Sequence, residues 1–92
     1  MSKKSKYGIT AATAELFKFF NDVRDEYQRA TAKHGMFNSA HEGWAVIWEE
    51  LDELWDEVRK KRSNRDPKAM RGECIQIAAM TLKFVLSCCK EK

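Results

Sequence analysis

Apolar residues recur at helical spacing in three segments of this chain, and this pattern constrains the fold more than any other feature. The first segment predicts a helix over about residues 11–33. Ser39 followed by Glu42 forms a capping box, which predicts a second helix continuing to about residue 62. Asp66 followed by Pro67 is typical of a helix start, and the third helix should continue to about residue 89.

The size of the chain bears on how such helices are stabilised. One proline and four glycines are too few for a turn-rich β architecture, so the expected class is all-α. A chain of 92 residues removes only about 60% of its unfolded surface from water, and the third helix is apolar around most of its circumference. We therefore expect a three-helix protomer that assembles, as a homodimer or homotetramer, into an oligomeric helical bundle of the four-helix type. Residues 1–8 are expected to be a disordered leader and residues 9–92 a single domain.

Charge, hydropathy and cysteine content exclude several classes of partner. A net charge of +3 is only weakly basic, and we expect no nucleic-acid partner. The longest apolar stretch, residues 74–89, is shorter than the roughly 20 residues that span a bilayer, so no membrane association is expected. Three cysteines without a secretory leader indicate reduced thiols, and the expected location is the cytoplasm.

The charges of the second helix are segregated. Residues 42–57 contain seven acids and no Lys or Arg, whereas residues 59–71 contain seven basic residues and one acid. Glu49, Glu53 and Glu57 follow one another at four-residue intervals, and each like-charged pair costs a few tenths of a kcal/mol. A solvated polar face is one interpretation. A merely soluble helix normally alternates its charges, however, so the pattern favours a face that binds cations.

The third helix carries a single narrow polar strip, which consists of Glu73, Gln76, Lys83 and Ser87. A carboxylate in such an apolar helix is costly unless it is paired or coordinates a metal. The alternative is that Glu73 merely favours the positive N-terminal end of its helix. Glu50 and Glu53 on one helix, with Glu73 and Gln76 on the other, offer the oxygen ligands that suit Mg²⁺ or Mn²⁺. The adjoining basic residues are then candidates for neutralising a bound anion: Lys60, Lys61, Arg62, Arg65, Arg71 and Lys83.

A family resemblance adds to this interpretation. Glu49-Glu50-Leu51-Asp52-Glu53, followed after nineteen residues by Glu73-Cys74-Ile75-Gln76, is similar to the Glu-Glu-x-x-Glu and Glu-x-x-Asp signature of MazG-type nucleoside triphosphate pyrophosphohydrolases, the all-α pyrophosphatase superfamily. Residues 34–86 especially resemble short phage and bacterial members, so the cytoplasm of a phage host is a second expected location. The resemblance implies hydrolysis of a (deoxy)nucleoside triphosphate between its α and β phosphates, which gives a monophosphate and pyrophosphate.

The resemblance also implies roles for individual residues. Glu50, Glu53 and Glu73 match the family's magnesium ligands. Glu49 matches a further ligand, a group beside the ligands or a base that orients water. The catalytic candidates are therefore Glu49, Glu50 and Glu53. Gln76 occupies the position of the family's aspartate, and its amide brings neither a charge nor a base at neutral pH. The alternative function is therefore a catalytically silent helical oligomer that binds nucleotide or a protein partner.

Recognition of the nucleotide base has several candidates. His34 and Asn38 lie in an expected loop with free hydrogen-bonding groups, although a simple turn explains them equally well. Trp44 can stack on a base, but tryptophan on an apolar helix face is more often part of a core or an interface. The expected substrate-binding residues are thus His34, Asn38, Trp44, Lys61, Arg71 and Lys83.

Overall fold

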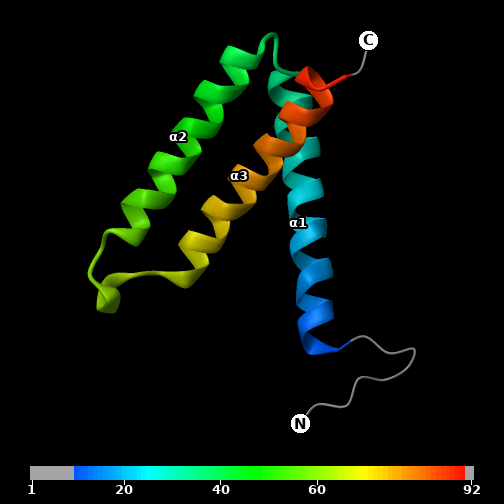
Figure 1. The fold of residues 1–92 in the computed structure, drawn as a ribbon. Helices are drawn as coiled ribbons and strands as arrows, with labels where there is room; N and C mark the ends of the chain where they lie inside the picture. The colour runs from blue at the N-terminus through cyan, green and yellow to red at the C-terminus, as the bar shows by residue number, and fades with distance from the viewer. Residues whose placement is uncertain (1–9, 91–92) are drawn as a thin grey trace.

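The computed structural model describes residues 10–90, which form three α-helices (Figure 1). Helix α1 spans Ala11–His34, α2 spans Ala40–Val58 and α3 spans Pro67–Cys88; a single turn of 3-10 helix, η1, spans Arg62–Asn64. No strand occurs among residues 10–90, so the expected all-α class and the three helices are confirmed. The leader expected over residues 1–8 lies outside the described residues.

The ends of the helices follow local capping. The N-caps are Thr10, Ser39 and Asp66, and each side chain accepts a hydrogen bond from a backbone N–H two or three residues later. These bonds satisfy donors that the first turn of a helix leaves unpaired. Gly35 ends α1 with a φ of 75°, a left-handed conformation that glycine adopts without strain. The two helix starts predicted at Ser39 and Asp66 are confirmed.

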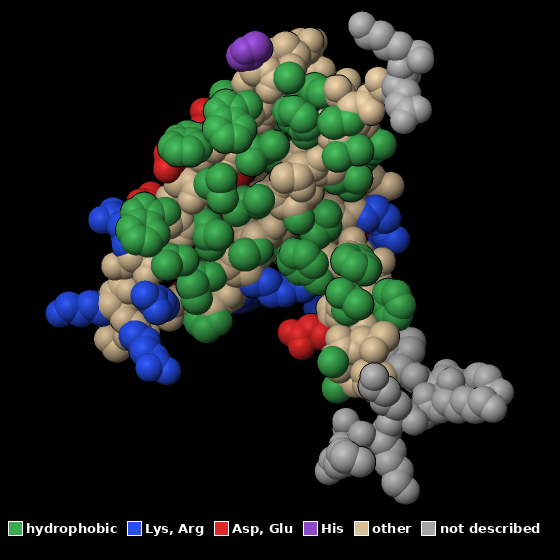
Figure 2. Space-filling model, in the orientation of Figure 1, with side chains coloured by type: hydrophobic (Ala, Val, Ile, Leu, Met, Phe, Trp, Pro, Cys, Tyr) green, Lys and Arg blue, Asp and Glu red, His purple; other side chains and the backbone are tan. Residues whose placement is uncertain are grey.

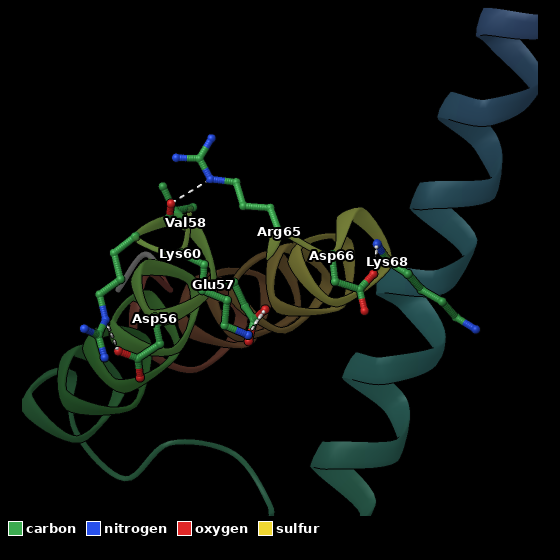
Figure 3. Close-up of polar contacts among 8 residues, drawn as sticks. Asp56, Glu57, Val58, Lys60, Arg65, Asp66 and Lys68 are labelled. Carbon is green, nitrogen blue, oxygen red and sulfur yellow. Dashed lines mark hydrogen bonds and ion pairs between the residues drawn. The ribbon is translucent and has the colours of Figure 1, made fainter. Parts of the chain in front are cut away.

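The predicted end of α2 at about residue 62 is wrong, because the helix ends at Val58. The Nε of Arg65 donates to the Val58 carbonyl at 2.8 Å, as Figure 3 shows, and so satisfies a carbonyl that a further helical turn would use. Continuation would also place Arg59 and Arg62, two like charges three residues apart, as neighbours on one side of the helix. A side chain seven residues away thus ends the helix.

Helix α3 is the central element of the fold. It packs against both α1 and α2, whereas α1 and α2 do not pack against each other. Figure 1 shows α2 running antiparallel to α3, while α1 crosses near the C-terminal end of α3 and diverges from the hairpin towards its own N-terminus. Within residues 10–90 the chain therefore forms an open arrangement of three helices, and the four-helix bundle remains a prediction about assembly.

The buried core is small. Ala30 of α1 and Ala79 and Met80 of α3 are its only buried apolar residues within the described range, and no large side chain there is fully buried. Gly43 lets α2 approach α3 closely, because a Cβ at this position would lie 2.6 Å from Cδ2 of Phe84. Partly buried side chains surround the core: Val23, Tyr27, Phe37, Val46 and Ile47.

Large apolar side chains remain exposed on one face of the molecule. Figure 2 shows hydrophobic side chains covering α2 and α3 on this side and continuing onto α1, with charged side chains at the edges. None of the described helices is both long enough and apolar enough to cross a membrane. The exposed large apolar residues in the described range are Leu16, Phe17, Phe20, Met36, Trp44, Trp48, Leu51, Trp55, Val85 and Leu86. We call the four that recur along one side of α2, Trp44, Trp48, Leu51 and Trp55, the apolar face.

Candidate metal centre

Three carboxylates from two helices converge in the structure. Glu50 and Glu53 lie one turn apart on α2, and Glu73 lies in the second turn of α3. One carboxylate oxygen of each residue lies within 4.8 Å of the other two. The antiparallel hairpin explains this convergence, because both segments lie near the turn that joins α2 to α3. We call these three residues the carboxylate cluster.

The carboxylate cluster is crowded with negative charge. Burial raises the pKa of Glu50 to about 7, and the neighbouring charge of Glu53 adds to the shift. Burial also raises the pKa of Glu73, again with a contribution from Glu53. No Lys or Arg among the described residues contributes to either shift. The chain itself therefore supplies little counter-charge to the cluster.

The donor set of the cluster fits a magnesium ion. The Oε2 atoms of Glu50 and Glu73 are buried and have no hydrogen-bond partner among residues 10–90. A buried carboxylate oxygen without a partner is costly, and a cation between the two helices removes that cost. Carboxylate oxygens are the ligands that Mg²⁺ and Mn²⁺ prefer, and two opposite ligands of Mg²⁺ lie about 4.2 Å apart. That separation is close to the observed spread of the cluster.

A cavity of about 550 Å³ adjoins the carboxylate cluster and extends along α2 and α3 towards the α1–α2 turn. Glu50 belongs to both the cluster and the cavity wall, and Glu49 and Gln76 line the same wall. The volume is typical of a small-molecule site. Three more of the residues expected from the sequence to bind substrate line this cavity: His34, Asn38 and Lys83.

These three residues have different surroundings. Lys83 is only 3% exposed, and its Nζ lies 4.9 Å from the centre of the Phe37 ring. The backbone N–H and the side-chain amide of Asn38 donate to the Glu42 carboxylate at 3.0 and 3.3 Å, so Asn38 helps to cap α2. His34 is the exposed last residue of α1. Of the three, Lys83 is the one that is enclosed.

Three other expected site residues lie outside the cavity. Arg71 faces α1, where its guanidinium lies 2.9 Å from the Asp22 carboxylate and 5.6 Å from the centre of the Phe19 ring. Trp44 belongs to the apolar face and is 61% exposed. Lys61 is exposed at the start of η1. The structure therefore does not bring Arg71, Trp44 or Lys61 together with the residues that line the cavity.

The turn between α2 and α3 neutralises the last acids of α2. Arg59 pairs with Asp56 and Lys60 pairs with Glu57, at N–O distances of 3.1 and 2.9 Å, and Figure 3 shows the second pair. These pairs are local, three residues apart along the chain. The acids of α2 thus divide into a paired set at the end of the helix and the carboxylate cluster, whose members form no ion pair within the described range.

Several residues of the cavity wall were not among the expected site residues. Glu26 and Arg29 of α1 form an ion pair that lowers the pKa of Glu26, and Phe37 and Met80 supply apolar wall. The spacing of Glu26 from Ala30 places it on the buried side of α1, which is a signal that the sequence does contain. No local signal marks Phe37. Comparison of the chain with protein-family models, with curated proteins and with solved structures found no match.

Proposed function

We propose that this protein is a Mg²⁺-dependent nucleotide pyrophosphohydrolase that cleaves (deoxy)nucleoside triphosphates to monophosphates and pyrophosphate. The observation that carries the proposal is the convergence of Glu50, Glu53 and Glu73 from two helices beside a cavity of about 550 Å³. These are the residues that the resemblance to the MazG-type enzymes implies as magnesium ligands. A carboxylate cluster with unpartnered oxygens, next to a ligand-sized cavity, suits the binding of a metal and a phosphorylated substrate.

In this proposal the residues around the cavity have distinct roles. Glu50, Glu53 and Glu73 hold Mg²⁺, or Mn²⁺, and the ion supplies neutralisation of phosphate charge and a lowered pKa for the attacking water. Glu49 lines the cavity next to Glu50 and orients that water or accepts its proton. Gln76 lines the same wall and offers a neutral amide oxygen where the family has an aspartate. Water attacks the α–β phosphoanhydride, and pyrophosphate leaves.

The basic turn supports departure of pyrophosphate. Lys61 is exposed and forms no ion pair with any residue from 10 to 90, so its charge is available to an anion. The neighbouring Lys60 is instead held by Glu57. Lys61 lies on the turn at the end of the hairpin nearest to the carboxylate cluster. A cation at this position stabilises the negative charge of the departing pyrophosphate, which leaves on the side of the carboxylate cluster opposite to the cavity.

Pyrophosphate release tests the proposal directly. We expect release from at least one member of a panel of ordinary and modified (deoxy)nucleoside triphosphates with Mg²⁺, and a loss of about 100-fold or more in the Glu53→Gln variant. Asp52→Asn is the matched control, because Asp52 is an exposed acid of the same helix outside the cluster. Absence of release from every substrate, with nucleotide still bound, would favour the alternative of a catalytically silent oligomer that binds nucleotide or a protein partner.

We also propose that the working form is a homo-oligomer joined through the apolar face. The three half-exposed tryptophan side chains alone present roughly 300 Å², and with the exposed apolar side chains of α1 and α3 the surface approaches the ~800 Å² per partner of a standard interface. Trp44, Trp48, Leu51 and Trp55 share one side of α2, opposite the acids of the same helix. A second copy on this face therefore leaves the carboxylate cluster and the cavity open to substrate.

Sedimentation at micromolar concentration tests the assembly. We expect a homodimer or homotetramer, and we expect Trp48→Glu to shift the protein to a monomer because the variant places a charge in the centre of the apolar face. Ala32→Glu is the control, since it adds the same charge at an exposed position of α1 outside the face. A well-folded wild-type monomer would contradict the proposed interface.

A further inference from the structure

The cavity lies on only one side of the carboxylate cluster. It meets the cluster at Glu50 and extends only towards the α1–α2 turn, where Phe37 and Lys83 lie. On the other side of the cluster lies the exposed basic turn between α2 and α3. If the proposed function is correct, phosphates belong at the cluster and towards the basic turn. The nucleoside then belongs in the cavity, which has apolar wall as well as polar groups.

Lys83 is the unusual residue of this cavity. It is only 3% exposed, yet its ammonium forms neither an ion pair nor a hydrogen bond with any of residues 10–90. The Phe37 ring covers one side of the ammonium at 4.9 Å, a cation–π contact that leaves its N–H donors without acceptors. Lys83 lines the cavity, so a ligand bound there can accept the hydrogen bonds that no described residue accepts from its ammonium.

The position of Lys83 along α3 argues against a phosphate as that acceptor. Lys83 lies ten residues after Glu73 on the same helix, which corresponds to about 15 Å along the axis. The two side chains lean in the same direction along the helix, so this separation persists between their charged groups. Phosphates held by an ion at the cluster lie too far away to contact Lys83. The base of an extended nucleotide spans such a distance.

We propose that Lys83 recognises the base of the substrate and selects a 6-oxopurine nucleotide, an inference that rests on the proposed function. Guanine and hypoxanthine present two adjacent acceptors, O6 and N7, to which one ammonium donates. Adenine replaces O6 with an amino group, whose N–H donors oppose the ammonium. Uracil and thymine offer one acceptor, O4, and rank between the two purine classes. Lys83 is thus a specificity-determining residue, and Phe37 positions its ammonium.

Equilibrium binding tests this inference with the full chain and Mg²⁺. The probes are non-hydrolysable α,β-methylene triphosphates of deoxyguanosine, deoxyinosine and deoxyadenosine, with binding measured by calorimetry. We expect the two 6-oxopurine analogues to bind about 10–100-fold more tightly than the adenine analogue, because hydrogen bonds from a charged donor typically contribute this much to affinity. Deoxyinosine lacks the 2-amino group, so its agreement with deoxyguanosine assigns the preference to O6 and N7.

Variants assign the preference to the lysine. Lys83→Met keeps the length of the side chain and suits its apolar surroundings, and we expect the affinities for the guanine and adenine analogues to become similar. Lys68→Met, an exposed lysine at the start of the same helix, should preserve the wild-type ratio. Equal wild-type affinities, or an unchanged ratio in Lys83→Met, would overturn the role of Lys83 and leave the pyrophosphohydrolase proposal standing. Absence of both nucleotide binding and pyrophosphate release would overturn both proposals. The comparison of the three analogues uses the wild-type protein, so the test does not depend on whether a variant folds.

Discussion

Glu50→Gln should stabilise the metal-free protein, and the gain should depend on pH. The pKa of Glu50 is about 7 in the folded chain against an ordinary value of 4.5. Ionising Glu50 therefore costs folding free energy. At about 1.4 kcal/mol per pKa unit, the full shift corresponds to ~3 kcal/mol, and solvent screening of this partly exposed group reduces the effect to on the order of 1–2 kcal/mol.

The sign follows from proton linkage. A carboxyl group with a raised pKa binds its proton more tightly in the folded state, so the contribution of Glu50 to stability is greatest below pH 4.5 and is lost as the pH rises through about 7. Glutamine resembles the protonated acid at every pH. The difference in unfolding free energy between Glu50→Gln and wild type should therefore be near zero at pH 4.5 and reach its full value at pH 8.

Urea unfolding at fixed protein concentration in a chelator measures this difference across pH 4.5–8. Asp52→Asn is the control, because Asp52 is exposed, lies outside the carboxylate cluster and does not contribute to the pKa shift of Glu50; its effect should stay within about 0.5 kcal/mol. Adding Mg²⁺ should reverse the order, since wild type gains roughly 2.7 kcal/mol at a hundred times Kd and the variant gains much less. Magnesium affinity should also rise with pH through 7, because protons compete for the ligands. Equal stabilisation of both proteins by Mg²⁺ would refute the metal centre, and a pH-independent difference in the chelator would refute the raised pKa of Glu50.

Three further substitutions test the packing. Gly43→Ala should destabilise the protein by about 1–3 kcal/mol, because the new Cβ would lie 2.6 Å from Phe84, and an unchanged melting temperature would contradict the close approach of α2 to α3. Gly72→Ala should instead stabilise it by about 0.5–1 kcal/mol in thermal unfolding, since this helical site has open space around it. Arg71→Met should cost at most about 1 kcal/mol by breaking the pair with Asp22, and hydrogen exchange should show faster opening of α1 with little change in α2.

Sequence patterns predicted the parts of the site that depend on local geometry. Ser39 and Asp66 cap their helices through bonds that span two or three residues, and such bonds require no tertiary partner. Glu50, Glu53 and Glu73 were identified from charge crowding and from a motif on two helices, and the short turn of the hairpin brings them together. The all-α class followed for the same reason, because helical periodicity is a property of neighbouring residues.

Only the tertiary structure decided which helix faces are covered. Periodicity placed the tryptophans on the apolar side of α2, but α3 covers other residues of that side and leaves Trp44, Trp48 and Trp55 exposed. Arg71 was expected near an anion, and it instead pairs with Asp22 some fifty residues earlier in the chain. Lys83 is enclosed because the α1–α2 turn places Phe37 over it. A helical pattern specifies the direction in which a side chain points from the axis of its helix. The residue that the side chain contacts depends on how the helices cross, and long-range packing sets that crossing.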